Sequence, residues 1–63
     1  MKLYQVCVES YLSNNSDYKE YDNYYCKAES WQAASDYAKQ CIDNWNKQSK
    51  GVIYHVYNIT PHN

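Results

Sequence analysis

Residues 30–45, SWQAASDYAKQCIDNW, decide the fold of this 63-residue chain. Ser30 is a favoured helix N-cap, because its hydroxyl accepts a hydrogen bond from a free backbone N–H in the first turn. The apolar residues that follow recur at spacings of three and four, which predicts a helix over residues 31–48 with one apolar stripe. Gly51, the only glycine, is placed to end this helix in a left-handed cap. The stripe consists of Trp31, Ala34, Ala38, Cys41 and Trp45, widened by Tyr37 and Ile42.

Three segments around the helix have the composition and alternation of β-strands. Residues 2–12 and 20–28 are separated by the polar run 13–17, so we expect a β-hairpin with a five-residue loop. Within the second segment, Asp22 and Asn23 are poor strand residues and are candidates for a bulge. A third strand over 52–60 has apolar residues on both sides of its alternation, and we expect Pro61 to end it.

This order of elements predicts a single α+β domain over residues 1–63, a ββαβ mini-domain in which one helix packs on one face of a small sheet. The helical crossover places the third strand either beside the second, in parallel, or beside the first. We favour the mostly antiparallel sheet of order 2-1-3, because a crossover that skips one strand gives the helix width to pack on. The expected strand residues of the inner layer are Tyr4, Val6, Val8, Tyr24, Cys26, Ala28, Val52, Tyr54 and Val56.

One helix covers one face, so the alternation leaves the opposite face without cover. That face is expected to carry Leu3, Gln5, Cys7, Tyr21, Tyr25, Ile53, His55, Tyr57 and Ile59. An apolar and aromatic layer of this kind is typical of a contact surface. Tyrosine is common at interfaces, because it joins a large ring to a polar tip. The predicted partner-binding residues are Tyr18, Tyr21, Tyr25, Tyr57, Ile53, His55 and Ile59.

The composition excludes several classes of protein. Six lysines and seven carboxylates give a net charge of −1 without any arginine, which is unlike a nucleic-acid binder driven by electrostatics. No apolar stretch is long enough to span a bilayer, and without a basic segment followed by an apolar run at the N-terminus we expect no signal peptide. Three widely spaced cysteines, Cys7, Cys26 and Cys41, form no disulfide framework, so we expect a cytoplasmic protein with reduced thiols. Nine tyrosines and no phenylalanine leave few aliphatic residues for a core, which favours association with a second copy.

We expect no catalytic site, cofactor or metal. Cys7 and His55 share the uncovered face, but no oxyanion-hole signature or orienting group accompanies them as a nucleophile pair. The cysteines and histidines lack the close ligand pairs of structural zinc sites. The carboxylates are scattered singly and are interpreted as solvated surface charge: Glu9, Asp17, Glu20, Asp22, Glu29, Asp36 and Asp43.

These observations predict a small protein-binding module that acts by steric occlusion through its tyrosine-rich surface, as a homodimer. The alternative is the binding of single-stranded nucleic acid, or of a nucleotide-like ligand, by tyrosine stacking on the open sheet face. In size and in its Asn-, Lys- and Tyr-rich, Arg-free composition, the chain is similar to small phage or mobile-element proteins that inhibit host machinery. Among these are anti-defence proteins such as CRISPR inhibitors, and the similarity implies an inhibitor in the host cytoplasm.

Overall fold

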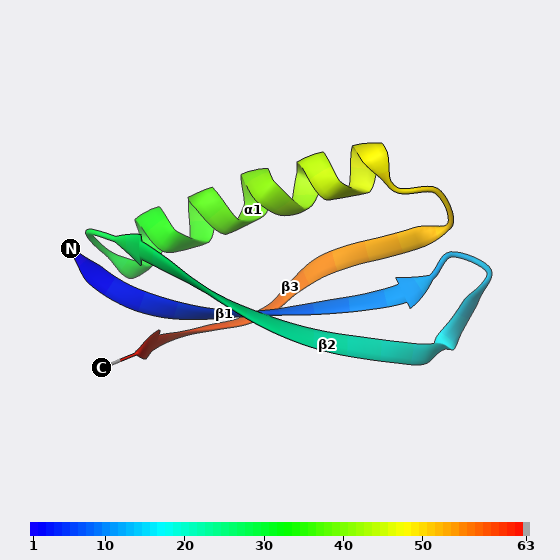
Figure 1. The fold of residues 1–63 in the computed structure, drawn as a ribbon, viewed down its shortest axis with the longest axis horizontal. Coiled ribbons are helices and arrows are strands. Elements are labelled where there is room, and N and C mark those ends of the chain that lie inside the picture. The colour runs from blue at the N-terminus through cyan, green and yellow to red at the C-terminus, as the bar shows by residue number, and fades with distance from the viewer. Residues whose placement is uncertain (63) are drawn as a thin grey trace.

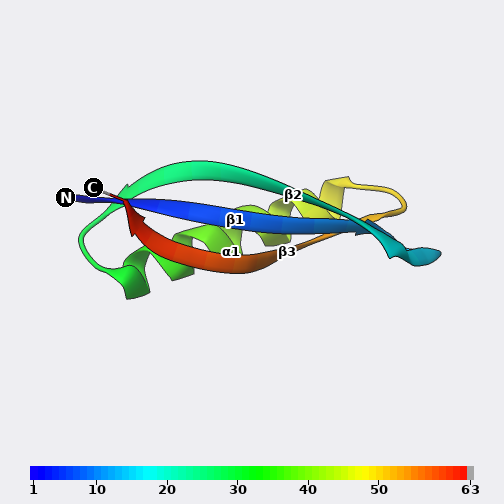
Figure 2. The same cartoon turned by 90° about the horizontal axis from the view of Figure 1, so that it is seen from below.

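A computed structural model describes residues 1–62 and contains three strands and one helix in the order ββαβ (Figure 1). They are β1 (Lys2–Leu12), β2 (Asn15–Ala28), α1 (Trp31–Gln48) and β3 (Val52–His62). The strand order is β2-β1-β3, with both pairings antiparallel, and α1 lies on one side of the sheet (Figures 1 and 2). The α+β fold and the order 2-1-3 predicted from the sequence are confirmed, and the alternative with parallel strands is wrong.

The hairpin between β1 and β2 is tighter than the sequence suggests. Its turn consists of Ser13 and Asn14 alone, and β2 begins at Asn15 instead of residue 20. Asn15 Oδ1 accepts a hydrogen bond from the backbone N–H of Asp17 at 3.2 Å, so an Asx turn follows the hairpin tip. Ser13 N–H donates to the Gly51 carbonyl at 2.9 Å and so joins the hairpin turn to the connection between α1 and β3.

The register of the hairpin is regular over most of its length. Asp22 and Asn23, the candidates for a bulge, pair in sequence with Val8 and Cys7, so that prediction is wrong. The irregularity in this pairing lies beside the turn, between Tyr11 and the next residue of β1. The residues that precede and follow Asp22 and Asn23 along β2 pair with β1, and this pairing overrides the low strand propensity of the two residues.

Helix α1 begins and ends at the predicted residues, but its C-terminal cap is not the predicted one. Ser30 Oγ accepts from the Ala33 N–H at 3.1 Å, which confirms the N-cap. At the other end Ser49 is extended, and its N–H still donates to the Trp45 carbonyl at 2.9 Å. Gly51 has a φ of 84°, but this left-handed residue lies in the turn into β3 and not at the helix cap. Among residues 1–62 no helix combines the length and apolarity needed to cross a membrane.

The core lies between α1 and the sheet, and α1 packs mainly against β3. Ala34 and Ala38 are fully buried and let the helix approach the strands closely. Trp31 and Trp45 were expected in the core but remain about half exposed, because rings of this size flank a helix–sheet contact that two alanines make close. The buried hydrophobic residues are Tyr4, Val6, Val8, Ala28, Ala34, Ala38, Ile42 and Ile59, with Tyr24, Cys26, Tyr54 and Val56 packed against them.

A bulge in β3 changes which residues face the helix. Val56 pairs with Val8 whereas Asn58 pairs with Cys7, so Tyr57 is the extra residue and the alternation shifts by one position after it. Ile59, predicted on the open face, consequently pairs with Val6 and is buried beneath α1. The prediction for Ile59 is therefore wrong. Pro61 does not end the strand either, since an edge strand tolerates a residue without an N–H and β3 continues to His62.

Candidate binding surface on the open face of the sheet

The sheet face turned away from α1, called the outer face below, is the side of the molecule that Figure 2 presents. A row of three residues crosses its three strands, because Glu9 on β1 pairs with Tyr21 on β2 and with His55 on β3. In an antiparallel sheet, directly opposite residues point to the same side. The outer face includes Tyr21, Tyr25, Ile53, His55 and Tyr57 around Glu9.

Glu9 is buried at the centre of this otherwise open face. Only 6% of the residue is exposed, although the sequence suggests a solvated surface charge. The Tyr21 hydroxyl donates to Glu9 Oε2 at 2.9 Å, and His55 Nε2 lies 3.7 Å from Oε1. The hydrogen bond to Glu9 raises the pKa of the Tyr21 hydroxyl, with desolvation and the carboxylate charge acting in the same direction. The carboxylate thus holds the Tyr21 ring in a defined orientation.

Two ring contacts order the remaining aromatic side chains. Tyr57, the bulged residue of β3, meets Tyr21 of β2 edge to face, with ring centroids 5.1 Å apart and an interplanar angle of 71°. This contact joins the two edge strands over the central strand. Further along the sheet, the Tyr25 and His62 rings lie 4.9 Å apart at 58°. Tyr21, Tyr25 and Tyr57 are each exposed over about half of their surface. Their rings are therefore held in place by these contacts and still open to a partner.

The structure therefore brings five of the seven predicted binding residues together. Tyr21, Tyr25, Tyr57, Ile53 and His55 share the outer face, whereas Tyr18 and Ile59 do not. Sequence reasoning missed Glu9 and His62 as members of this surface. The predicted five-residue loop already implies the pairing of Glu9 with Tyr21, because residue 12 opposite residue 18 sets that register, and the observed pairs from Lys2 to Tyr11 keep it.

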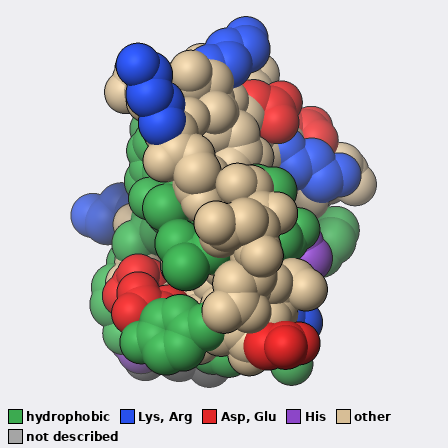
Figure 3. All heavy atoms as spheres, turned by 90° about the vertical axis from the view of Figure 1, so that its right-hand side faces the viewer, with side chains coloured by type: hydrophobic (Ala, Val, Ile, Leu, Met, Phe, Trp, Pro, Cys, Tyr) green, Lys and Arg blue, Asp and Glu red, His purple; other side chains and the backbone are tan. Residues whose placement is uncertain are grey.

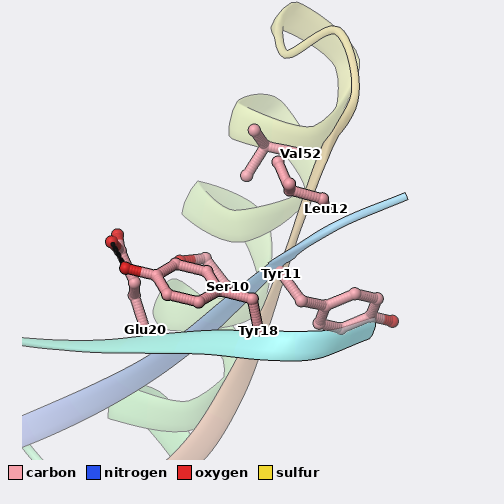
Figure 4. A pocket seen from close by; sticks show the side chains of 6 residues that line it. All are labelled: Ser10, Tyr11, Leu12, Tyr18, Glu20 and Val52. Carbon is pink, nitrogen blue, oxygen red and sulfur yellow. Dashed lines mark hydrogen bonds between the residues drawn. The ribbon is translucent and has the colours of Figure 1, made fainter. Parts of the chain in front are cut away.

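Tyr18 lies on the helix side of the sheet, beyond the hydrophobic core. Its hydroxyl donates to Glu20 Oε1 at 3.1 Å, and this hydrogen bond raises the pKa of the Tyr18 hydroxyl. The two side chains line a small pocket of about 140 Å³ at the base of the hairpin (Figure 4). Tyr18 and Glu20 are exposed at its rim, on the side of the sheet opposite the outer face, so Tyr18 belongs to a separate part of the surface. The lining is completed by Ser10, Tyr11, Leu12 and Val52.

A groove of about 510 Å³ runs between α1 and β2 on the helix side. Burial raises the pKa of the Cys26 thiol, and the nearby Cys41 contributes in the same direction. Tyr24 is the most perturbed group here, because burial raises its pKa to about 12. The Tyr24 hydroxyl oxygen is buried without a hydrogen-bond partner among residues 1–62. The groove is lined by Tyr24, Tyr25, Cys26, Lys27, Tyr37, Cys41 and Trp45.

The chemistry of these surfaces favours contact. Cys7 and His55 both belong to the outer face, and the acidic residue near His55 is Glu9, which is engaged by Tyr21. Within the described part of the chain, no three His, Cys, Asp or Glu residues are grouped as metal ligands would be. Charges of both signs are interspersed around the end of the molecule seen in Figure 3, with hydrophobic side chains between them. The outer face offers ordered rings with polar tips instead of a reactive group.

Comparisons of this chain with protein-family models, with curated proteins and with solved structures found no match.

Proposed function

We propose that this protein is a small protein-binding module whose contact surface is the outer face of the sheet. The observation that carries the proposal is the set of half-exposed rings Tyr21, Tyr25 and Tyr57 on a face that no element of residues 1–62 covers. Exposed aromatic patches of this kind mark contact sites, and tyrosine is enriched among the residues that dominate binding energy.

The fixed conformations of the aromatic side chains on the outer face support this function. Tyr21 is fixed by Glu9 and by Tyr57, so little side-chain freedom remains to be lost when a partner binds. Ordering a free side chain at an interface costs about 0.5–1.5 kcal/mol, and rings that are already held avoid much of this cost. Ile53 and His55 extend the patch along β3 with one apolar and one polar side chain.

A protein partner is favoured over a nucleic acid by the charges of the outer face. Lys19 and Lys27 sit near opposite ends of β2 on this face, whereas a carboxylate, Glu9, stands at its centre. Surfaces that stack bases normally place cations along the phosphate backbone. Stacking rings are present here, but the central negative charge works against a phosphate chain that would cross them.

The mode of action we propose is steric occlusion, in which the module covers a functional surface of its partner. An inhibitor of host machinery, encoded by a phage or mobile element and acting in the cytoplasm, fits a small domain that works by contact. The three free thiols Cys7, Cys26 and Cys41 suit a reducing compartment.

The proposal is tested by substituting, one at a time, two tyrosines of nearly equal exposure that lie on opposite faces of the sheet. Tyr57 on the outer face is 59% exposed and Tyr18 on the helix side is 60% exposed. Tagged wild-type protein and the variants Tyr57→Ser and Tyr18→Ser are used to isolate partners from a lysate of the cells that produce the protein, with quantification by mass spectrometry. We expect Tyr57→Ser to lower recovery of a stoichiometric protein partner at least tenfold and Tyr18→Ser to leave recovery unchanged.

Circular dichroism of both variants checks that helix content is retained. Equal recovery with wild-type protein and Tyr57→Ser would contradict the outer face as the contact surface. Co-purification of RNA, DNA or a nucleotide, detected by absorbance at 260 nm and lost as salt rises, would instead favour the alternative function by base stacking.

A further inference from the structure

The two edges of the sheet differ, and the edge formed by β3 is closed by α1. The Asn46 side chain reaches from the helix to the backbone of Tyr54: its Nδ2 donates to the Tyr54 carbonyl at 2.9 Å and its Oδ1 accepts from the Tyr54 N–H at 2.8 Å. One side-chain amide thus occupies the donor and the acceptor that a neighbouring strand would otherwise engage.

The far end of the same edge is closed by four further features. The Ile59 carbonyl accepts from Trp31 Nε1 at 3.1 Å, and the Ile59 N–H donates to Asn58 Oδ1 at 3.0 Å. The bulge at Tyr57 bends the strand, and Pro61 offers no N–H. Bulges, proline and covering elements are the means by which natural sheets prevent pairing at an edge. β3 is therefore a poor strand for further pairing.

The edge formed by β2 has none of these features between residues 19 and 28. This segment pairs with β1 in continuous register and contains neither glycine nor proline. Alternate residues direct their N–H and C=O groups away from β1. Among residues 1–62, the only side chain that bonds the β2 backbone is Asn15, next to the turn. Since α1 packs mainly against β3, the helix leaves space beside β2.

We propose that β2 pairs with β2 of a second copy of this chain, antiparallel across a two-fold axis, to form a six-stranded sheet. This proposal is independent of the proposed function, because it concerns the edge of the sheet and not the outer face. We favour an identical β2 as the partner strand, because two copies can pair over a long stretch without placing like charges opposite one another.

The charges select the register by exclusion. In a symmetric antiparallel pair, the central residue lies opposite its own copy, and a residue before the centre lies opposite the residue equally far after the centre in the second copy. Like charges in such opposite positions destabilise the pair. Centring on Glu20 or Asp22 opposes each to its own copy, and centring on Tyr21 opposes Glu20 to Asp22. Centring on Asn23 opposes Lys19 to Lys27.

Centring on Tyr24 or on Tyr25 is free of such conflicts, but centring on Tyr25 pairs only residues 22–28. Centring on Tyr24 places Lys27 opposite the Tyr21 ring of the second copy and Asp22 opposite its Cys26, and it pairs residues 20–28 along their whole length. The two grooves beside β2 would then meet at the axis, with Tyr24 at the centre. On the other side of the sheet, the outer faces of both copies would join in one surface.

Sedimentation equilibrium or light scattering after size exclusion, at 10–500 μM protein, tests the pairing on the full chain; these concentrations are about those at which weak homodimers form. The expected mass is twice the 7.5 kDa of one chain. The double variant Asn23→Lys with Tyr25→Lys places lysines opposite lysines at the axis and is expected to be monomeric. The matched control Ile53→Lys with Thr60→Lys adds the same charge on β3 and is expected to stay dimeric. A wild-type monomer throughout, or a dimer lost only in the control, would overturn the proposal.

A covalent test covers the case in which the lysine variant fails to fold. Asp22→Cys creates a thiol opposite the native Cys26 of the second copy, within reach of a disulfide between directly paired strand residues. Oxidised glutathione should convert Asp22→Cys to a dimer on non-reducing gels, with peptide mapping showing the 22–26 link. Asp17→Cys lies outside the paired region and should stay monomeric on the gel. A 22–22 link, or equal cross-linking of both variants, would refute the register centred on Tyr24.

Discussion

Tyr24 shows how a single hydroxyl can oppose folding. Its ring packs against the core and lies 6.0 Å from the Trp45 ring, but the buried hydroxyl oxygen has no hydrogen-bond partner among residues 1–62. A buried polar group without a partner costs about 1–3 kcal/mol. We predict that Tyr24→Phe raises the free energy of unfolding by about 1 kcal/mol at pH 7. Urea unfolding of wild type and variant, at one protein concentration, measures this change.

The pH dependence of stability provides a second test of the role of the Tyr24 hydroxyl. Burial raises the Tyr24 pKa from 10.0 to about 12, so the folded protein keeps a proton that the unfolded chain loses. The stability linked to this group is complete below pH 10 and declines as pH rises through 12. Tyr24→Phe should lack this part of the alkaline decline, while the part due to Tyr18 and Tyr21 persists. Identical pH profiles for variant and wild type would show that the Tyr24 hydroxyl is solvated.

At the scale of elements, Asn46 joins α1 to β3 through two hydrogen bonds to one residue. Both backbone groups of Tyr54 bond to this amide, at 2.9 Å and 2.8 Å. We predict that Asn46→Ala lowers the free energy of unfolding by about 1–2 kcal/mol, because it leaves an N–H and a carbonyl without protein partners. Thermal unfolding is the measurement.

Asn44→Ala is the matched control for Asn46→Ala. Asn44 is exposed on the same helix, and the substitution removes the same amide without a strand contact. It should change stability by less than about 0.5 kcal/mol. Similar losses of stability for the two variants would mean that helix propensity, and not the two hydrogen bonds from Asn46 to Tyr54, explains the effect. Without these hydrogen bonds the β3 edge should be open to pairing. Asn46→Ala should then form larger species at high protein concentration, which light scattering would detect.

Local signals predicted the elements better than their ends. The Ser30 cap and the spacing of Ala34, Ala38 and Ile42 predict α1 correctly, because capping and periodicity depend on residues within a few positions. The path of the chain between α1 and β3, and the start of β2, depend on contacts distant in the sequence. Ser13, for example, bonds Gly51 across the molecule, and no local pattern contains that contact.

For the whole molecule, the small core makes each buried aliphatic residue important. Val6 lies on the central strand, pairs with Tyr24 and Ile59, and is the one large side chain of residues 1–62 with almost no exposed surface. A chain of this size has a free energy of unfolding of about 3–9 kcal/mol. We predict that Val6→Ala removes about 2–3 kcal/mol and populates the unfolded state near 37 °C.

Ile53→Ala is the comparison for Val6→Ala. Ile53 is an aliphatic residue of the outer face with 37% exposure, and its truncation should cost less than about 1 kcal/mol. Calorimetry of both variants gives the difference. A cost for Ile53→Ala equal to that for Val6→Ala would show that the outer face is part of a core, as it would be if a second copy covered it.

The amino-acid pattern alone predicts that one amphipathic helix covers one face of a small sheet and leaves an aromatic face open. Period and capping are local properties, and they placed Tyr21, Tyr25, Tyr57, Ile53 and His55 on that face. The tertiary structure places Ile59 in the core against the expected alternation, because β3 has apolar residues on both sides and its sequence does not reveal the bulge at Tyr57. It also decided that Glu9 lies beneath the rings, since that position follows from pairing across three strands.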